Sequence, residues 1–150
     1  MSYFIDSNIL IYSIDNRDTR KHKQARAVLS TLARTESGYI SSQVLSEFAN
    51  VMLRKYSQPK DRIYKLIAYY EQVFSVYLVT PTIVLEAVRG VEQYQLAFYD
   101  AQIWAIAKLN QIPIVLSEDF NPGSTIENVL FQNPFDQDFE LPGGLADASV

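Results

Sequence analysis

The sequence predicts an α/β fold organised on a parallel β-sheet. Five short segments have the composition of strands, and segments with apolar residues at helical spacing lie between them. The strand segments are apolar without alternating polar positions, so we expect helices to cover both faces of the sheet. Strands that alternate with helices in this way are typical of a parallel sheet. The expected strands are residues 3–5, 39–40, 76–79, 112–116 and 129–131.

Composition indicates one globular domain and excludes several kinds of site. The chain has 150 residues, of which 48% are hydrophobic and 20% charged, enough for a substantial core. We expect a single domain over residues 1–135 and a flexible, acidic tail over 136–150. No apolar run approaches the roughly 20 residues of a membrane span, and Asp6 interrupts the first one, so we expect no secretory signal and a cytoplasmic protein. The absence of cysteine excludes disulfides, thiolate catalysis and zinc–thiolate sites.

The first expected strand runs directly into a carboxylate. Asp6 separates it from a second apolar run, which we expect to form a short helix over residues 9–14, and no cation is near in sequence. Asp6 could be the N-cap of that helix, since Asp is a favoured capping residue. Alternatively it could be a functional acid, because local inconsistencies of this kind often mark functional sites. The stretch itself leaves both interpretations open.

Three helices are expected in the next part of the chain. The first spans residues 19–35, with Gly38 as its stop signal. The second, over residues 43–56, carries an apolar stripe, and Glu47 lies at the edge of that stripe, about 60° from Val44 on a helical wheel. The third begins at Pro59, which suits the first turn of a helix, and it forms a hairpin with the second.

The second half repeats the alternation of strand and helix. Thr80-Pro81 predicts the start of a helix after the strand at 76–79, and residues 93–97 are expected to form a loop or a frayed helix end. A helix over residues 98–110 is apolar nearly all round, which indicates a central position. Its first turn contains Asp100, which either serves the site or acts as the N-cap or dipole partner of this helix. Asp119 follows the strand at 112–116, and residues 121–123 predict a turn before the last strand.

Four acids could meet at one edge of the sheet: Asp6, Glu47, Asp100 and Asp119. Ligands of parallel sheets bind outside the carboxyl ends of the strands. Like charges that lie together need compensation, and no lysine or arginine is adjacent in sequence to Asp6, Asp100 or Asp119. A divalent cation would provide it, and oxygen ligands favour Mg²⁺ or Mn²⁺. Such ions commonly serve attack on phosphorus.

The charges are unevenly distributed along the chain. The net charge is −4, yet the first 65 residues carry +5 (eleven basic and six acidic) and the remainder −9 (two basic and eleven acidic). A basic patch on an acidic protein can bind a phosphate backbone. The alternative is that these charges are solvated faces of helices.

The chain resembles the PIN-domain family, in particular the VapC-type ribonuclease toxins of toxin–antitoxin pairs. The resemblance covers about residues 2–135 and depends on the order of several short motifs. They are Asp6-Ser7-Asn8 after a strand, Ser46-Glu47-Phe48 in a helix, Tyr99-Asp100-Ala101 at a helix start, Leu116-Ser117-Glu118-Asp119-Phe120 after a strand, and Asn133-Pro134-Phe135.

The resemblance implies a three-layer α/β/α sandwich with a central parallel sheet of four to five strands, usually dimeric, and an antitoxin that covers the site. It implies a metal-dependent endoribonuclease, a hydrolase that uses Mg²⁺ or Mn²⁺ to cut RNA. Glu118 and Asp119 both qualify as the fourth acid; we choose Asp119 because the family places a hydroxyl residue two positions before it. The implied catalytic residues are Asp6, Glu47, Asp100 and Asp119, and the implied supporting residues are Asn8 and Ser117. For the mechanism, we expect Asp6, Asp100 and Asp119 to be the metal ligands. We expect RNA to lie against the basic segment, with Arg17, Arg20, Lys21 and Lys23 as RNA-binding residues.

Two other functions are compatible with parts of the pattern. A haloacid-dehalogenase-type phosphatase also has an aspartate after its first strand, but that family requires a second aspartate two residues later, where this chain has Asn8. A non-catalytic PIN-like module that binds RNA or protein is the other alternative. Metal-dependent cleavage of RNA would separate it from the nuclease.

Overall fold

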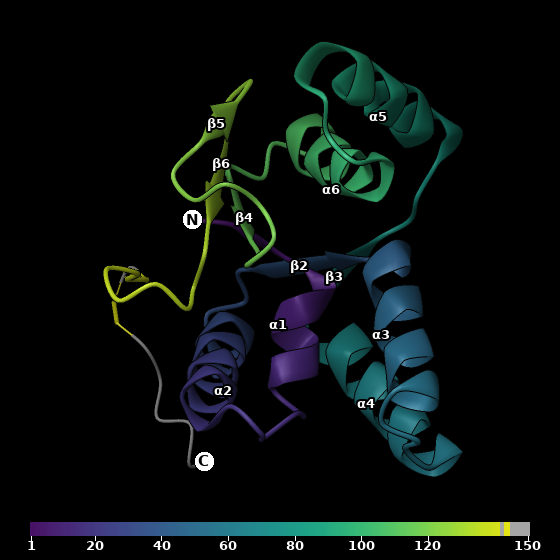
Figure 1. The fold of residues 1–150 in the computed structure, drawn as a ribbon, viewed down its shortest axis with the longest axis vertical. Coiled ribbons are helices and arrows are strands. Elements are labelled where there is room, and N and C mark those ends of the chain that lie inside the picture. The colour runs from purple at the N-terminus through teal and green to yellow at the C-terminus, as the bar shows by residue number, and fades with distance from the viewer. Residues whose placement is uncertain (142, 145–150) are drawn as a thin grey trace.

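The computed structural model describes residues 1–141, 143 and 144, and it places one β-sheet between two layers of helices (Figure 1). The sheet order is β3-β2-β1-β4-β6-β5, and every neighbouring pair is parallel except β5 with β6. The five parallel strands agree with the expected sheet, and β5 adds a short antiparallel edge. The strands are β1 (Tyr3–Ile5), β2 (Gly38–Ser41), β3 (Ser75–Tyr77), β4 (Ile114–Leu116), β5 (Thr125–Ile126) and β6 (Val129–Gln132).

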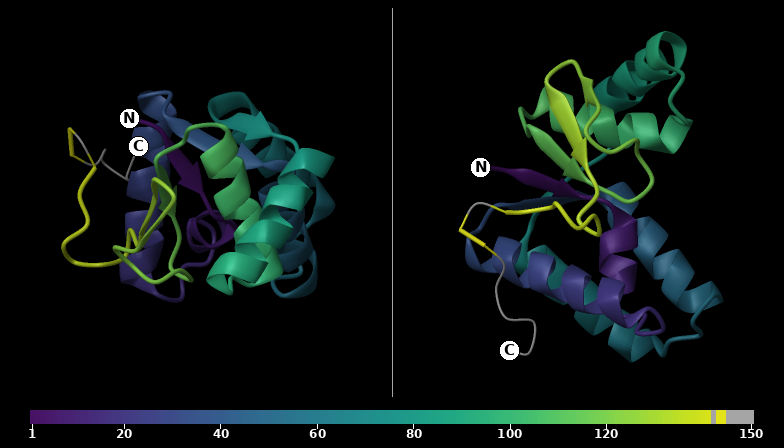
Figure 2. Two further views of the ribbon diagram at one scale, coloured as in Figure 1. Left: turned by 90° about the horizontal axis from the view of Figure 1, so that it is seen from above. Right: turned by 60° about the vertical axis from the view of Figure 1, so that its left-hand side comes forward.

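The helices divide between the two faces of the sheet as a three-layer sandwich requires. Figures 1 and 2 show α5 (Pro81–Tyr94) and α6 (Phe98–Leu109) on one side, where α6 packs on β4 and β6. The other side is covered by α1 (Ser7–Tyr12), α2 (Thr19–Arg34), α3 (Ser42–Arg54) and α4 (Lys60–Val73). Helices α3 and α4 pack together as the expected hairpin.

Helix α6 is the most deeply buried helix of the described chain. Its residues 101–107 are all buried, and Trp104 is fully enclosed, which confirms the central position predicted from its composition.

The helix start predicted from Thr80-Pro81 is confirmed: Thr80 caps α5, and Pro81 lies in the first turn. Pro59 lies one position earlier than expected, as the N-cap residue of α4, which begins at Lys60. Ser41 caps α3.

One predicted helix stop is wrong. Gly38 does not end α2; it is the first residue of β2, and α2 ends at Arg34. The left-handed backbone conformation after the helix belongs to Glu36, with φ 54°. Gly38 is needed for a different reason: a Cβ there would lie 2.5 Å from the Phe74 ring. A glycine is required at this position because the Phe74 ring leaves no room for a side chain, and not because the chain reverses there.

The β5–β6 hairpin was not predicted from the sequence. Its two-residue turn, Glu127-Asn128, has positive φ at both positions, 47° and 71°, where Asn-Gly is the usual signal. Distant side chains hold this unusual turn: Arg89 and Lys108 form ion pairs with Glu127 at 2.9 and 3.0 Å. Tertiary contacts therefore replace the missing glycine.

Chain packing continues beyond residue 135. Phe135 and Leu141 are both buried in the core. The rest of the predicted flexible tail, at 142 and 145–150, lies outside the described residues. In the part of the chain that the structure describes, no helix has the length and apolar character to cross a membrane.

Candidate functional site

The register of β1 and β4 brings two of the predicted site residues together. Ile5 pairs with Leu116 in the parallel ladder, so the next residue on each strand, Asp6 and Ser117, lies at the same carboxyl edge. The Ser117 hydroxyl donates a hydrogen bond to Asp6 Oδ2 at 2.7 Å. Sheet topology thus juxtaposes residues that are 111 positions apart.

The capping role that the sequence left open for Asp6 is confirmed, and its second carboxylate oxygen faces the other predicted site residues. It is the N-cap of α1, and its Oδ1 accepts a hydrogen bond from the Ser7 backbone N–H at 2.7 Å. Its Oδ2 faces Ser117 and the Asn8 amide. The residue is 3% exposed, and within the described residues no cation forms an ion pair with it. A capping residue alone would not require this burial of an unpaired carboxylate.

Asn8 and Ser117 connect Asp6 to Asp119. Asn8 Nδ2 donates to Ser117 Oγ and to Asp119 Oδ2, both at 3.1 Å. The Asp119 backbone N–H also donates to Ser117 Oγ at 3.1 Å. Asn8 and Ser117, which were expected to support the acids, therefore both form hydrogen bonds with Asp6 and with Asp119.

Glu47 and Asp100 approach the same edge from helices on opposite sides of the sheet. Glu47, on α3, accepts hydrogen bonds from the Ser7 hydroxyl at 2.8 Å and from the Gln43 amide at 2.6 Å. Asp100 lies half-buried in the first turn of α6, whose N-cap is Ala97. It is therefore not the capping residue of that helix.

The four acids interact electrostatically. Burial, together with the charges of Glu47 and Asp119, raises the pKa of Asp6 to about 7, although hydrogen bonds from Ser117 and Ser7 oppose the shift. Burial, followed by the charges of Asp119 and Glu47, also raises the pKa of Asp100. The site therefore holds more negative charge than its own protein groups compensate.

Glu118 and Asp119, which the sequence could not separate on local grounds, have different partners. Glu118 forms an ion pair with Lys21 at 2.9 Å, and Lys21 also lies over the Tyr12 ring. Asp119 accepts from Asn8 and contributes to the raised pKa of Asp6. The geometry favours Asp119 as the member of the acidic group, because the charge of Glu118 is already paired.

The donor set fits a divalent cation held by few protein ligands. Within the described residues, no three His, Asp or Glu side chains are close enough to form a ready-made metal cage. Mg²⁺, however, is usually bound through one or two carboxylates and retains several waters. The available donors are oxygens, including Asn8 Oδ1, which is buried without a hydrogen-bond partner. The single histidine, His22, contacts the Tyr12 carbonyl through its Nδ1 at 2.9 Å.

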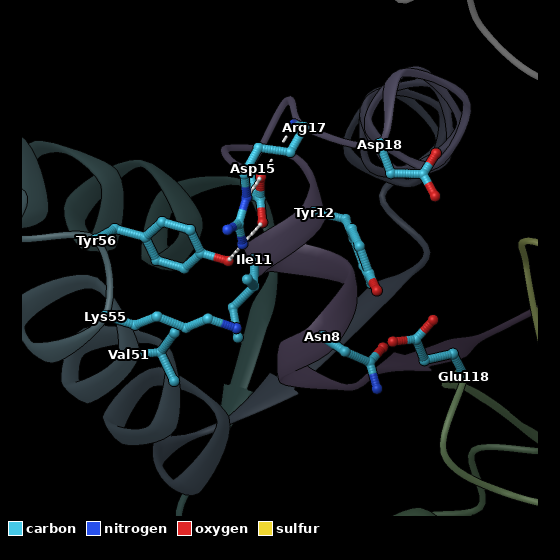
Figure 3. Close-up of a pocket in the computed structure, with 10 residues that line it drawn as sticks. All are labelled: Asn8, Ile11, Tyr12, Asp15, Arg17, Asp18, Val51, Lys55, Tyr56 and Glu118. Atoms are coloured by element: carbon cyan, nitrogen blue, oxygen red, sulfur yellow. Dashed lines mark hydrogen bonds and ion pairs between the residues drawn. The ribbon is translucent and has the colours of Figure 1, made fainter.

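A cleft of about 580 Å³ has Asn8 and Glu118 in its lining, although none of the four predicted acids lines it. In Figure 3, Asn8 and Glu118 lie on one side of it and Val51, Lys55 and Tyr56 on the other. Lys55 is exposed and belongs to α3's C-terminal cap. The sequence analysis did not single it out, since its proximity to Asn8 depends on how α1 packs against α3.

The four basic residues predicted to bind RNA differ in their surroundings. Arg17 forms an ion pair with Asp15 at 2.7 Å, and Arg20 donates to the Phe135 carbonyl at 2.8 Å. Lys21 pairs with Glu118, whereas Lys23 is exposed on α2. Three of the four therefore already have partners within the chain, and their role in RNA binding remains a prediction.

Three polar residues of the site were missed in the sequence: Ser7, Gln43 and Gln102. Gln102 is 6% exposed, and its Nε2 donates to Gln43 Oε1 at 2.6 Å. Two sequence signals could have indicated them. Gln43 lies one helical turn before Glu47, and Gln102 is the polar residue within the otherwise apolar run 101–107.

Comparison with known proteins provides the family context. The family model described as PIN domain matches residues 3–122. A search of curated proteins found no match. Among solved structures, a toxin–antitoxin complex from Klebsiella pneumoniae is similar, with 22% identity, a TM-score of 0.66, and coverage of 89% of this chain and 98% of that one.

Two further structures have the same fold. The Mycobacterium tuberculosis toxin VapC20, described as cleaving the sarcin–ricin loop, has 19% identity and a TM-score of 0.64, with coverage of 84% of this chain and 98% of that one. VapBC2 from Rickettsia felis, bound to a promoter DNA fragment, has 18% identity and a TM-score of 0.64, with coverage of 89% and 98%. At these identities the likeness shows the fold.

Proposed function

The chain belongs to the PIN domain family, and from this premise we propose that it is an endoribonuclease that hydrolyses RNA phosphodiesters with Mg²⁺ or Mn²⁺. PIN-domain nucleases generally use divalent metal ions. The observation that carries the proposal is Asp6: a buried carboxylate without a cationic partner in the described chain, with a raised pKa and with Asp119 and Glu47 close enough to raise it. A bound cation would compensate these charges.

Each residue of the site has a task in this proposal. Asp6, Asp100 and Asp119 would hold the ion, which supplies charge stabilisation on the phosphate oxygens and activation of water. Asn8 and Ser117 orient Asp6 and Asp119 through the hydrogen bonds between them.

Glu47 has a separate task in the reaction. Its carboxylate either contributes to holding the ion or accepts the proton of the attacking water at an Oε atom. Hydrogen bonds to both of its oxygens, from Ser7 and Gln43, fix the carboxylate for this work.

RNA would lie along the cleft that Asn8 lines, and Asn8 connects this cleft to the acids through its hydrogen bond to Asp119. Lys55 is exposed on its wall, where it can pair with a phosphate, and Tyr12 and Tyr56 offer aromatic surface for bases. Lys23 and Arg17 on the neighbouring basic segment, with Arg20 and Lys21, would extend this contact. The positive charge of the first 65 residues supports this placement.

The biological setting we propose is that of the toxin in a type II toxin–antitoxin pair. The Klebsiella pneumoniae and Rickettsia felis structures with this fold are toxin–antitoxin complexes. We therefore expect a cognate antitoxin protein and a homodimer as partners. Exposed apolar side chains, such as Leu78 and Leu85 at 68% and 72% exposure, offer surface for such association.

The test is cleavage of RNA by the purified protein. We expect single-stranded and stem-loop RNAs to be cut in Mn²⁺ or Mg²⁺ and to remain intact in EDTA, as followed on denaturing gels. RNA that is bound but never cut under any of these conditions would contradict the nuclease and leave the non-catalytic RNA-binding module.

Asp119 and Glu118 provide a matched pair for the fourth acid. Asp119→Asn should lower kcat for RNA cleavage by roughly 10- to 100-fold or more, the range found when the surroundings of a bound metal are altered. Glu118→Gln should change kcat by less than about threefold, because it removes only a partly exposed ion pair with Lys21. Kinetics of both variants on one RNA substrate decide the assignment, and the reverse order of effects would move it to Glu118.

A further inference from the structure

Two glutamines form a continuous hydrogen-bonded chain that ends on Glu47. Gln102 Nε2 donates to Gln43 Oε1 at 2.6 Å, and Gln43 Nε2 donates to Glu47 Oε1, also at 2.6 Å. The second N–H of the Gln43 amide faces the Tyr99 carbonyl, with N–O distance 3.3 Å. We call Gln43 and Gln102 the glutamine pair. All three polar positions of the Gln43 amide, two donors and one acceptor, are therefore occupied within the site.

The orientation of the Gln43 amide follows from its neighbours. If the amide were flipped, its oxygen would face a carboxylate oxygen of Glu47, and its nitrogen would face the Gln102 nitrogen. Both contacts would be repulsive. The Glu47 carboxylate, which can only accept, thus determines which end of Gln43 faces it, and the Gln43 oxygen then accepts from Gln102, which is 6% exposed on α6.

The donors to Glu47 are neutral. Ser7 Oγ donates to Oε2 at 2.8 Å and Gln43 to Oε1, and in the described residues no lysine, arginine or histidine forms an ion pair with Glu47. Glu118, by contrast, is paired with Lys21. Neutral donors fix the direction of a carboxylate and leave its charge available to a cation or a proton. Glu47 is therefore held in place without being neutralised.

The glutamine pair also connects the two helical layers. Gln43 belongs to α3, below the sheet in Figure 1, and Gln102 to α6, above it. Gln102 is two residues after Asp100, and Gln43 is four residues before Glu47. The distance between these two acids is thus restrained by side-chain hydrogen bonds across the edge of the sheet.

Resting on the proposed nuclease function, we propose that Gln43 and Gln102 are positioning residues that fix the Glu47 carboxylate relative to Asp100. Groups that orient such a site typically contribute 10- to 100-fold to activity. We therefore expect Gln43→Met, which keeps the side-chain length and removes the amide, to lower kcat by roughly 10- to 100-fold with little change in KM.

A double variant separates positioning from stability. Gln43→Met leaves the buried Gln102 amide without its acceptor, so Tm should fall. Gln43→Met combined with Gln102→Met removes both polar partners, and Tm should recover while kcat stays low. Recovery of kcat together with Tm would overturn the proposal, because it would assign the pair a structural role only. Gln72→Met, at an exposed position of α4, is the matched control and should change neither quantity.

A double-mutant cycle with Glu47 tests whether Gln43 affects RNA cleavage through Glu47. In a Glu47→Ala background, Gln43→Met should cost no further activity, because its target is absent. An equal loss in both backgrounds would contradict the proposal.

One readout does not depend on catalysis. In the protein without RNA, Glu47→Ala should shift the side-chain amide NMR signals of both Gln43 and Gln102. Unchanged signals would overturn the proposal that the glutamine pair positions Glu47, even if the protein cuts RNA. Shifted signals in a protein that cuts no RNA would support the pair while the nuclease function fails.

Discussion

Asp6→Asn is expected to abolish RNA cleavage and to stabilise the metal-free protein at neutral pH. A bound ion contributes several kcal/mol of charge stabilisation, and roughly 4 kcal/mol corresponds to about 10³-fold in rate. A loss of at least that size is expected if Asp6 holds the ion. If Asp6 only capped α1, Asp6→Asn would leave RNA cleavage unchanged, because Asn is an equally good N-cap.

The stability effect follows from the raised pKa of Asp6. Below the usual pKa of 3.8 the carboxyl is protonated in both the folded and the unfolded protein, and it contributes nothing. Between there and about 7 the folded protein retains a proton that the unfolded chain has released, so the free energy of unfolding decreases as pH rises. At pH 8 this destabilisation amounts to as much as about 4 kcal/mol. Asp6→Asn removes it.

Unfolding in urea with EDTA, at pH 5 and pH 8, measures this effect. The variant should be more stable than the parent protein at pH 8 and closer to it at pH 5. A variant that cleaves RNA at the parent rate, or that is less stable at pH 8, would contradict the role of Asp6.

Asp100→Asn is expected to lower RNA cleavage by at least about 10²- to 10³-fold, since it removes a second charge that would hold the ion. Its fold should be retained. The favourable interaction of an acid with the start of α6 is worth about 0.3–1 kcal/mol, and relief of repulsion from Asp119 and Glu47, which helps to raise the pKa of Asp100, offsets that loss. Thermal unfolding should therefore change little.

Asp61→Asn is the matched control for this variant. Asp61 is also an acid in the first turn of a helix, α4, and it is exposed. Its replacement should leave cleavage unchanged. If Asp100→Asn behaves like Asp61→Asn in the cleavage assay, the helix-dipole interpretation of Asp100 is sufficient and its place in the site is wrong.

The sequence predicted the order of elements well because apolar strands and helix caps are local signals. Thr80-Pro81 determines the start of α5 almost by itself. The turn at Glu127-Asn128 could not be predicted in this way, because Arg89 and Lys108 from other elements stabilise it. Gly38 was misassigned for the same reason: the Phe74 ring that requires it is distant in the sequence.

The site shows the same division between local and tertiary information. Asp6 and Asp119 could be identified because each follows an apolar strand. The parallel pairing of Ile5 with Leu116 then brings the ends of these two strands together. Gln43 and Gln102 are 59 residues apart, and no local pattern predicts that their amides meet. The partners of Arg20 and Lys21, at Phe135 and Glu118, were likewise invisible in the sequence.

The central claim is that the acids at the carboxyl edge of the sheet form a divalent-cation site. The most direct test is anomalous diffraction from crystals soaked with Mn²⁺ near pH 8, where Asp6 is ionised. We predict an anomalous peak within coordination distance of Asp6, with Asp100 or Asp119 as a further ligand. Peaks confined to other acids, such as Glu86 and Glu127, or no peak at Asp6, would contradict the account.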